Sequence, residues 1–126
     1  MATIELNAEN FVDTVTNNNI VIVDFWAPWC GPCQSFAPLY EELSEQHSDI
    51  VFAKVNTEDQ QQLAAQFQIR SIPTLTVFRE QIILYQEAGA LPKQALEQLI
   101  QQVKDVNMDE VRQSIEQEEA ASSDSK

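Results

Sequence analysis

The stretch FWAPWCGPCQSF, residues 25–36, holds both cysteines of the 126-residue chain, Cys30 and Cys33. An apolar, β-branched run typical of a buried strand (residues 20–27) leads into it, and an apolar pattern of helical spacing follows it. The sequence therefore predicts that the cysteines lie where a strand gives way to the start of a helix. Residues three apart in a helical turn share one face, so the two sulfurs can form a disulfide with little movement of the backbone.

The N-terminus of a helix favours negative charge, because its first N–H groups lack partners within the helix and the helix dipole is positive there. This setting favours the thiolate of Cys30, which is the nucleophilic form in disulfide exchange. We expect Cys30, at the exposed N-terminal end of the helix, to attack a substrate disulfide, and Cys33, one turn inside, to resolve the mixed disulfide. Between them, Gly31 lets another backbone approach closely, and Pro32 fits the first helical turn.

Two other uses of the cysteine pair fit the sequence less well. A structural disulfide at this spacing would close a very short loop and would constrain the unfolded chain little. A structural zinc ion needs four ligands. The one histidine, His47, follows Cys33 by 14 residues, which is roughly 21 Å along a continuous helix. We expect no metal here and a surface position near a helix end for His47. An iron–sulfur cluster that bridges two chains stays as a minor alternative.

Strand-like apolar runs alternate with apolar patterns of helical spacing along the chain. Strands are predicted at residues 3–6, 20–27, 50–56, 74–79 and 82–86, the last two forming a hairpin. Helical faces are predicted from the sets Phe11/Val12/Val15, Phe36/Leu39/Tyr40/Leu43, Leu63/Ala64/Phe67 and Leu96/Leu99/Ile100/Val103. The third of these helices is expected to start at Glu58 and Asp59. This order predicts an α/β domain with a mixed central sheet and helices on both faces.

The end of the chain has the pattern of an added acidic segment. Residues 105–126 hold seven acidic and two basic residues. Asn107 followed by Glu110 resembles a capping box, and three apolar residues then share one helical face: Met108, Val111 and Ile115. We expect a helix from there to about Glu119 and a frayed end at AASSDSK. The predicted organisation is one domain over residues 1–104 and an acidic C-terminal extension over 105–126.

Composition and charge exclude several classes of partner. Hydrophobic residues make up 44% of the chain, as in globular proteins. A net charge of −13 and a pI near 4.1 argue against nucleic acid, whose phosphates need a basic surface, and against an anionic membrane. The first residues show no secretory signal, and no apolar run approaches the ~20 residues of a membrane span. We expect a cytoplasmic protein that is a monomer.

The segment VDFWAPWCGPC is similar to the active-site segment of thioredoxins, and further segments follow in the order of that family. FAPLYEEL resembles the rest of its active-site helix, including the proline that kinks it (Pro38), and FAKVNTED resembles its next strand. IRSIPTLTVF resembles the segment of its cis-proline, here Pro73, and EAGAL resembles its glycine loop, here Gly89. The resemblance covers about residues 4–104 and is far more specific than a lone CxxC motif.

The resemblance implies the thioredoxin fold and a thiol–disulfide oxidoreductase. Such a protein reduces protein disulfides while Cys30 and Cys33 are oxidised, and so carries electrons in cellular redox homeostasis. It also implies recycling by thioredoxin reductase, a flavoprotein that would hold the NADPH and FAD. We expect no bound cofactor in this chain, which lacks a glycine-rich phosphate loop, beyond the redox-active disulfide itself.

Asp24 lies within an apolar strand, where a carboxylate is unfavourable to ionise. The residues alone leave open a carboxylate at a strand end that reaches water. The resemblance implies a buried carboxylate below the cysteines, whose raised pKa suits acid–base work, and we expect it to take the proton of Cys33 through water. The resemblance matches Lys54 to a buried lysine that pairs with this aspartate. A lysine that reaches solvent along its strand is the alternative.

The resemblance further implies a cis peptide bond between Ile72 and Pro73, facing the two sulfurs, where sequence alone favours trans. The backbone of Ile72 can then hydrogen-bond an extended substrate. A flat, mainly apolar docking surface around Cys30 is expected from Trp29, Gly31, Pro32, Ile72, Pro73, Gly89 and Ala90. Such a surface suits many protein disulfides. For Trp26 we expect chiefly a packing role in the core.

Three features depart from the common pattern of the family. The hairpin turn reads Glu80-Gln81 without glycine, although Gln disfavours a positive φ. Gln34 follows the second cysteine where a basic residue is common, which makes the field on Cys30 less positive. The acidic extension lies past the usual end. Two other functions stay open at this point: a disulfide oxidase or isomerase, and a non-enzymatic interaction module of the same fold.

Overall fold

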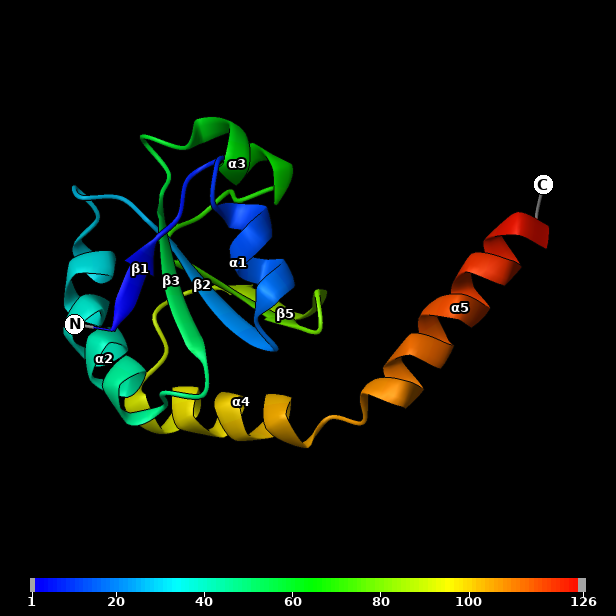
Figure 1. Cartoon of the computed structure of the whole chain (residues 1–126). Helices are drawn as coiled ribbons and strands as arrows, with labels where there is room; N and C mark the ends of the chain where they lie inside the picture. Colours follow the sequence, from blue (N-terminus) through cyan, green and yellow to red (C-terminus); the bar gives the residue numbers. More distant parts are fainter. Residues whose placement is uncertain (1, 125–126) are drawn as a thin grey trace.

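The computed structural model describes residues 2–124, with side chains described for residues 2–120 (Figure 1). Within this part of the chain the elements are β1 (Thr3–Glu5), α1 (Phe11–Asn17), β2 (Ile20–Trp26), α2 (Gly31–Gln46), β3 (Val51–Asn56), α3 (Gln61–Gln66), β4 (Thr74–Arg79), β5 (Ile82–Ala88), α4 (Lys93–Asp105) and α5 (Met108–Asp124). The predicted alternation of strands and helices is confirmed.

The strands form one mixed sheet in the order β1-β3-β2-β4-β5. The three strands β1, β3 and β2 are parallel, and β4 and β5 join them antiparallel. The central strand β2 is buried on both faces, because its alternate side chains enter two separate cores. Its continuous apolar sequence is the pattern expected of such a strand.

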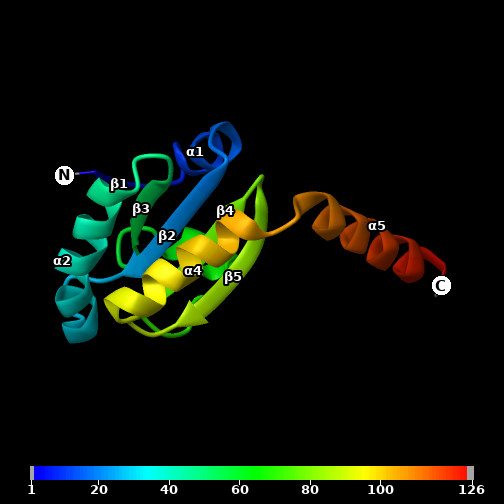
Figure 2. The ribbon, with the colours of Figure 1, turned by 90° about the horizontal axis from the view of Figure 1, so that it is seen from below.

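The two cores lie on opposite faces of the sheet. On one face, α2 and α4 cover side chains that include Ile22, Phe52 and Val77. On the other face, α1 and α3 cover Val21 and Phe25, among others. Figures 1 and 2 show these helices as outer layers with the sheet between them. The mixed α/β sheet with helices on both faces is therefore confirmed.

The structure corrects two details of the predicted helices α1 and α3. Val12 was expected on the buried face of the first helix, but its side chain is 68% exposed. Phe11 and Val15, one turn apart, point to the sheet, and Val12 lies about 100° further around the helix. The third helix begins at Gln61, not at Glu58. The side chain of Asn56 accepts a hydrogen bond from the backbone of Glu58 and holds that segment in a turn.

The extension after α4 is helical, and it is longer than expected. The structure carries α5 to Asp124, whereas the sequence predicted an end near Glu119. Gln, Glu and Ala are good helix formers, so the helix continues past its last apolar residue. Residues 125–126 of the expected frayed end lie outside the described residues. In both views α5 points away from the rest of the molecule (Figures 1 and 2).

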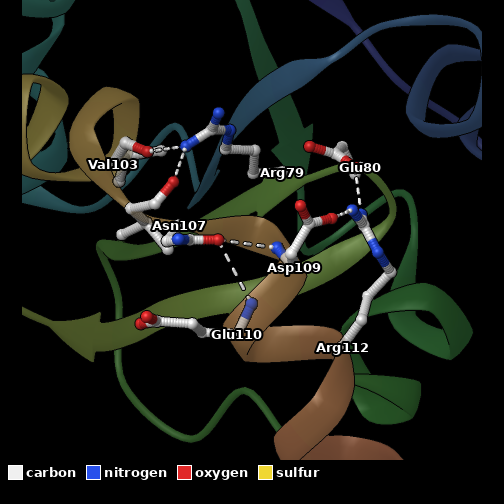
Figure 3. A network of polar contacts seen from close by, with 8 residues as sticks. Arg79, Glu80, Val103, Asn107, Asp109, Glu110 and Arg112 are labelled. Carbon is white, nitrogen blue, oxygen red and sulfur yellow. Dashed lines mark hydrogen bonds and ion pairs between the residues drawn. The ribbon is translucent and has the colours of Figure 1, made fainter.

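The β4–β5 turn is where the body of the molecule meets α5. Glu80 and Gln81 adopt φ values of 52° and 72°, so the expectation that Gln81 avoids positive φ is wrong. The turn is held from outside, because the backbone N–H of Glu80 donates to Asn19 O at 2.8 Å and Arg112 of α5 pairs with the Glu80 carboxylate. Figure 3 shows this ion pair beside the second one that Arg112 makes, to Asp109 at 2.6 Å.

Arg79 and Asn107 organise the junction between α4 and α5. The Arg79 guanidinium donates to the carbonyl oxygens of Val103, Lys104 and Val106 at 2.7, 3.1 and 2.7 Å, which places a cation at the C-terminus of α4. The Asn107 side chain accepts from the backbone N–H groups of Asp109 and Glu110, as predicted. Figure 3 draws no hydrogen bond from the Glu110 side chain back to Asn107, so the reciprocal half of the capping box is not formed among the residues drawn.

Candidate active site

Cys30 and Cys33 form a disulfide at the start of α2, directly after β2. Cys30 is the residue that caps the helix, and its Sγ accepts a hydrogen bond from the backbone N–H of Cys33 at 3.3 Å. In the reduced protein the same N–H would face a thiolate at this atom. The strand-to-helix junction predicted from the sequence is confirmed.

Cys30 is more buried than the sequence analysis expected. Cys30 was placed at an exposed helix end, but it is only 5% exposed, and Cys33 is 3% exposed. The reason is local packing, because Trp26 and Ile72 lie against the cysteine pair. Only a small part of the Cys30 side chain is therefore accessible to a partner.

The segment before β4 lies beside Cys30. The peptide bond between Ile72 and Pro73 is cis, as the resemblance implied. The carbonyl oxygen of Ile72 lies 3.8 Å from Cys30 Sγ. Gly89 has a φ of 116° and donates its N–H to the carbonyl of Pro73 at 2.8 Å, so the loop after β5 is attached to this segment. A backbone carbonyl from a distant segment thus adjoins the disulfide, and the Gly89 loop holds that segment.

Exposed residues surround the disulfide on the side of α2. Trp29 is 66% exposed, and its indole N–H donates to the carboxylate of Glu58. Gly31 and Pro32 are also exposed, in the first turn of α2. Sequence reasoning missed Glu58, which it treated only as a helix start, because no local pattern indicates a partner 29 residues away.

Asp24 is buried on the sheet face that α2 and α4 cover. Its side chain is 1% exposed, and its Oδ1 atom has no hydrogen-bond partner among the described residues. Burial raises the pKa of this carboxyl to about 7, and the nearby charge of Lys54 opposes the rise. Asp24 lies on the same face of β2 as Trp26, which packs against the cysteines. A carboxyl that titrates near neutrality thus lies two residues before Trp26 on the same face of β2, and Trp26 packs against the disulfide.

Lys54 lies beside Asp24 but does not form an ion pair with it within the described part of the chain. The two residues are register partners on β3 and β2. The Lys54 ammonium lies over the ring of Trp26, 4.4 Å from its centroid, where a cation–π contact stabilises it. Lys54 is half-buried, so it is neither fully buried nor extended freely into solvent.

Residues 2–124 contain no group of three or more His, Cys, Asp or Glu side chains arranged to hold a metal ion. His47 caps the C-terminal end of α2 and stacks on Phe52, with ring centroids 6.4 Å apart. Within the same residues no helix combines the length and apolarity needed to cross a bilayer.

Comparison with known proteins gives a consistent result. The family model described as Thioredoxin matches residues 2–102. "Putative thioredoxin 2" of Streptomyces coelicolor is 50% identical over 119 residues, which cover 94% of this chain and 89% of that protein. The thioredoxin of Haemophilus influenzae is 41% identical over 101 residues, covering 79% and 94%. The solved structure of Plasmodium falciparum thioredoxin superposes with a TM-score of 0.73 at 36% identity, covering 79% of this chain and 97% of that one.

These matches differ in how much of the extension they include. The match to the Streptomyces protein is longer than residues 1–104 and therefore takes in part of the extension. The family model ends at residue 102, and the match to the Haemophilus protein covers 79% of the chain. At least one relative therefore carries a similar C-terminal segment.

Proposed function

The chain belongs to the thioredoxin family, and on this premise we propose that it is a cytoplasmic protein-disulfide reductase that a thioredoxin reductase recycles. Its chemistry is dithiol–disulfide exchange at Cys30 and Cys33. The observation that carries the proposal is the position of this pair at the N-terminus of α2, with a backbone N–H directed at Cys30 Sγ.

The reaction proceeds in two exchanges. The Cys30 thiolate attacks one sulfur of a substrate disulfide, a bond forms between that sulfur and Cys30 Sγ, and the other substrate sulfur leaves as a thiolate. Cys33 then loses its proton and attacks Cys30 Sγ, which releases the second substrate thiolate. The substrate gains two electrons and, once its thiolates are protonated, two protons, while Cys30 and Cys33 become the observed disulfide.

We assign the proton of Cys33 to Asp24. A carboxyl whose pKa is about 7 can accept a proton and return it at neutral pH. Asp24 is buried at the same end of the sheet as the cysteines, and the transfer passes through water. Lys54 is assigned a supporting role, because its positive charge opposes the burial effect and keeps the carboxyl able to ionise.

Substrate docking is assigned to the surroundings of the disulfide: the exposed Trp29, Gly31, Pro32 and Gly89, the half-buried Ile72, and Pro73, which is buried and contributes through its cis peptide bond to Ile72. The carbonyl oxygen of Ile72 lies 3.8 Å from Cys30 Sγ, so a segment that pairs with this backbone places its own sulfur near the nucleophile. Most of the contact is apolar or backbone, which suits substrates that share a disulfide and little else.

Two further parts of the proposal concern its partners and its organisation. The chain is proposed to act as a monomer in the cytoplasm and to receive electrons from a reductase that holds NADPH and FAD. Residues 1–104 are proposed to hold all of the catalytic machinery, and 105–126 are proposed as an acidic extension that takes no part in the reaction.

The test is the equilibrium reduction potential of the Cys30–Cys33 couple, measured against a glutathione or dithiothreitol buffer. Thioredoxin itself has a potential of about −270 mV, and a strong oxidant of similar chemistry has about −120 mV. A value near the first, together with reduction of insulin disulfides by NADPH and a bacterial thioredoxin reductase, is the expected result. A value near the second would reverse the direction of electron flow and favour an oxidase.

A further inference from the structure

Three charged residues from three strands form one row across the sheet. Glu5 of β1 is the register partner of Lys54 on β3, and Lys54 is the register partner of Asp24 on β2. Register partners in parallel strands point to the same face of a sheet. The cation thus lies between two carboxylates, one in the core and one at the edge of the sheet.

The two ends of the row differ in their access to water. Asp24 is 1% exposed, whereas Glu5 is exposed and lines a hollow of about 370 Å³. Trp26 and Asp59 also line this hollow. The Lys54 ammonium lies over the ring of Trp26, which lines the hollow together with Glu5. In the described residues it makes an ion pair with neither Asp24 nor Glu5, so it interacts with both carboxylates at longer range.

We propose that Glu5 is a positioning residue for the exchange reaction, which competes with Asp24 for the charge of Lys54. It does not contact the sulfurs, and it acts through the cation between the two carboxylates. By drawing the ammonium toward the hollow, Glu5 weakens the Lys54–Asp24 interaction. Asp24 therefore retains its affinity for a proton, which its assigned part in the proposed function requires.

The electrostatics of the row agree with this geometry. Lys54 lowers the pKa of both carboxyls, and the charge of Glu5 raises the pKa of Asp24. The pKa of Glu5 is itself raised, first by partial burial, while the charge of Asp59 across the hollow adds to the rise. The ionised form of Glu5 is destabilised by this environment and is stabilised by a nearby cation, so the attraction between Glu5 and Lys54 is favourable.

The remaining charged and titratable groups near the row come from α2. The Tyr40 hydroxyl lies 2.9 and 2.8 Å from the carbonyl oxygens of Ile22 and Ala53. Burial raises the pKa of Tyr40 well above its ordinary value, and the charge of Asp24 adds to this, so Tyr40 stays neutral in the working pH range. Glu41 accepts a hydrogen bond from the Thr3 hydroxyl. On β4, the register partner of Asp24 is the apolar Leu75.

The experiment measures the titration midpoint of Asp24 by ¹³C NMR of its carboxyl carbon, in the full chain, with Cys30 and Cys33 oxidised. In Glu5→Gln, we expect this midpoint to move to lower pH by more than about one unit. One charge two strand spacings away, at an effective dielectric constant near 20, contributes about 1.3 units directly, and the stronger Lys54–Asp24 interaction adds to the shift. The maximum in the pH–rate profile of disulfide exchange should move in the same direction.

Three variants complete the test. Glu5→Asp keeps the negative charge and should leave the midpoint close to its value in the unmodified protein. Glu116→Gln removes one exposed charge from α5 and should leave the midpoint unchanged. In a Lys54→Met background, Glu5→Gln should move the midpoint less far, because only the direct effect of the Glu5 charge remains and the part that passes through the cation is lost.

Two results would overturn the proposed competition between Glu5 and Asp24 for the charge of Lys54. One is an unchanged midpoint in Glu5→Gln, and the other is a shift of the same size in the Lys54→Met background. The readout does not depend on the assigned function of Asp24. If the midpoint shifts while the pH–rate profile does not, the row exists as described, but the acid–base assignment of Asp24 is wrong.

Discussion

Asp24 is a buried carboxyl whose ionisation, which its proposed role requires, lowers the stability of the folded chain. Its pKa is raised from 3.8 to about 7, so the native chain holds a proton that the unfolded chain releases over this pH range. The free energy of unfolding therefore falls as the pH rises from about 4 to about 7, and the loss is complete above that. A residue kept only for the fold would not be placed here, which supports a functional reason for it.

We predict that Asp24→Asn stabilises the protein at pH 8 by on the order of 2–4 kcal/mol, because three units of pKa shift correspond to roughly that energy. At pH 4 the two proteins should be nearly equal in stability. Guanidinium unfolding of the oxidised proteins at both pH values measures this. A stabilisation that is equal at the two pH values would show that ionisation is not its cause. Disulfide exchange by the variant should be slower despite its greater stability.

The order of the two cysteines gives a second prediction at this scale. Cys33→Ser should accumulate a mixed disulfide between Cys30 and a substrate protein, because the resolving thiol is missing. Cys30→Ser should accumulate none. Mass spectrometry of the variants after incubation with an oxidised substrate separates these outcomes. Trapping by Cys30→Ser alone would assign the nucleophile to Cys33.

Among the elements, the β4–β5 turn carries the clearest strain. Gln81 has a φ of 72°, a left-handed conformation that disfavours residues with a Cβ. We predict that Gln81→Gly raises the free energy of unfolding by about 0.5–1 kcal/mol. The same substitution at Gln98, exposed within α4, should lower it by about 1 kcal/mol. Thermal or denaturant unfolding measures both variants. If the positive φ of Gln81 is the cause, the two changes in the free energy of unfolding have opposite signs.

The C-terminus of α4 depends on a side chain from the sheet. Arg79 donates to three carbonyl oxygens there. We predict that Arg79→Met lowers the free energy of unfolding by about 1.5–3 kcal/mol, because charge-assisted hydrogen bonds to half-buried acceptors are lost.

Arg112→Met is the matched control for Arg79→Met. Its ion pairs to Glu80 and Asp109 are largely exposed, so its effect should stay below about 1 kcal/mol. Equal effects for the two arginines would mean that the capping contacts of Arg79 contribute little.

For the whole molecule, the question is where the folded domain ends. Met108 is 5% exposed and Arg79 binds the carbonyl of Val106, so the body of the molecule uses residues beyond 104. We predict that a chain ending at Gln113 keeps its stability within about 0.5 kcal/mol, whereas a chain ending at Lys104 loses about 1–3 kcal/mol. Equal stability of both truncated chains would place the boundary at 104, and both should retain disulfide exchange.

Local patterns were sufficient to predict most of the fold. The continuous apolar run of β2 and the face Leu96/Leu99/Ile100/Val103 of α4 are visible in short windows, and both are confirmed. The positive φ of Gln81 was not predictable, because contacts from Asn19 and Arg112, distant in sequence, hold that turn. The prediction that Val12 is buried was wrong for a different reason. Three apolar residues in a short helix do not define its buried face narrowly enough to exclude a neighbouring position.

The site was predictable to the extent that it is encoded in contiguous segments. The cysteine pair and the cis bond before Pro73 lie in recognisable stretches. Lys54 beside Asp24 was expected only through the family resemblance. The place of Glu5 in the row depends on strand register, and the hydrogen bond from Trp29 to Glu58 joins two separate loops. A single sequence does not specify either at this level of detail.

The direction of α5 makes the C-terminal end of this molecule a suitable attachment point. The helix extends for 17 residues, about 25 Å, and it points away from the side where α2 begins (Figures 1 and 2). A label, a bead or a fused protein attached beyond it would be held at a distance from the disulfide by a built-in spacer. The protein can therefore be immobilised by this end with its reactive surface left open to large substrates.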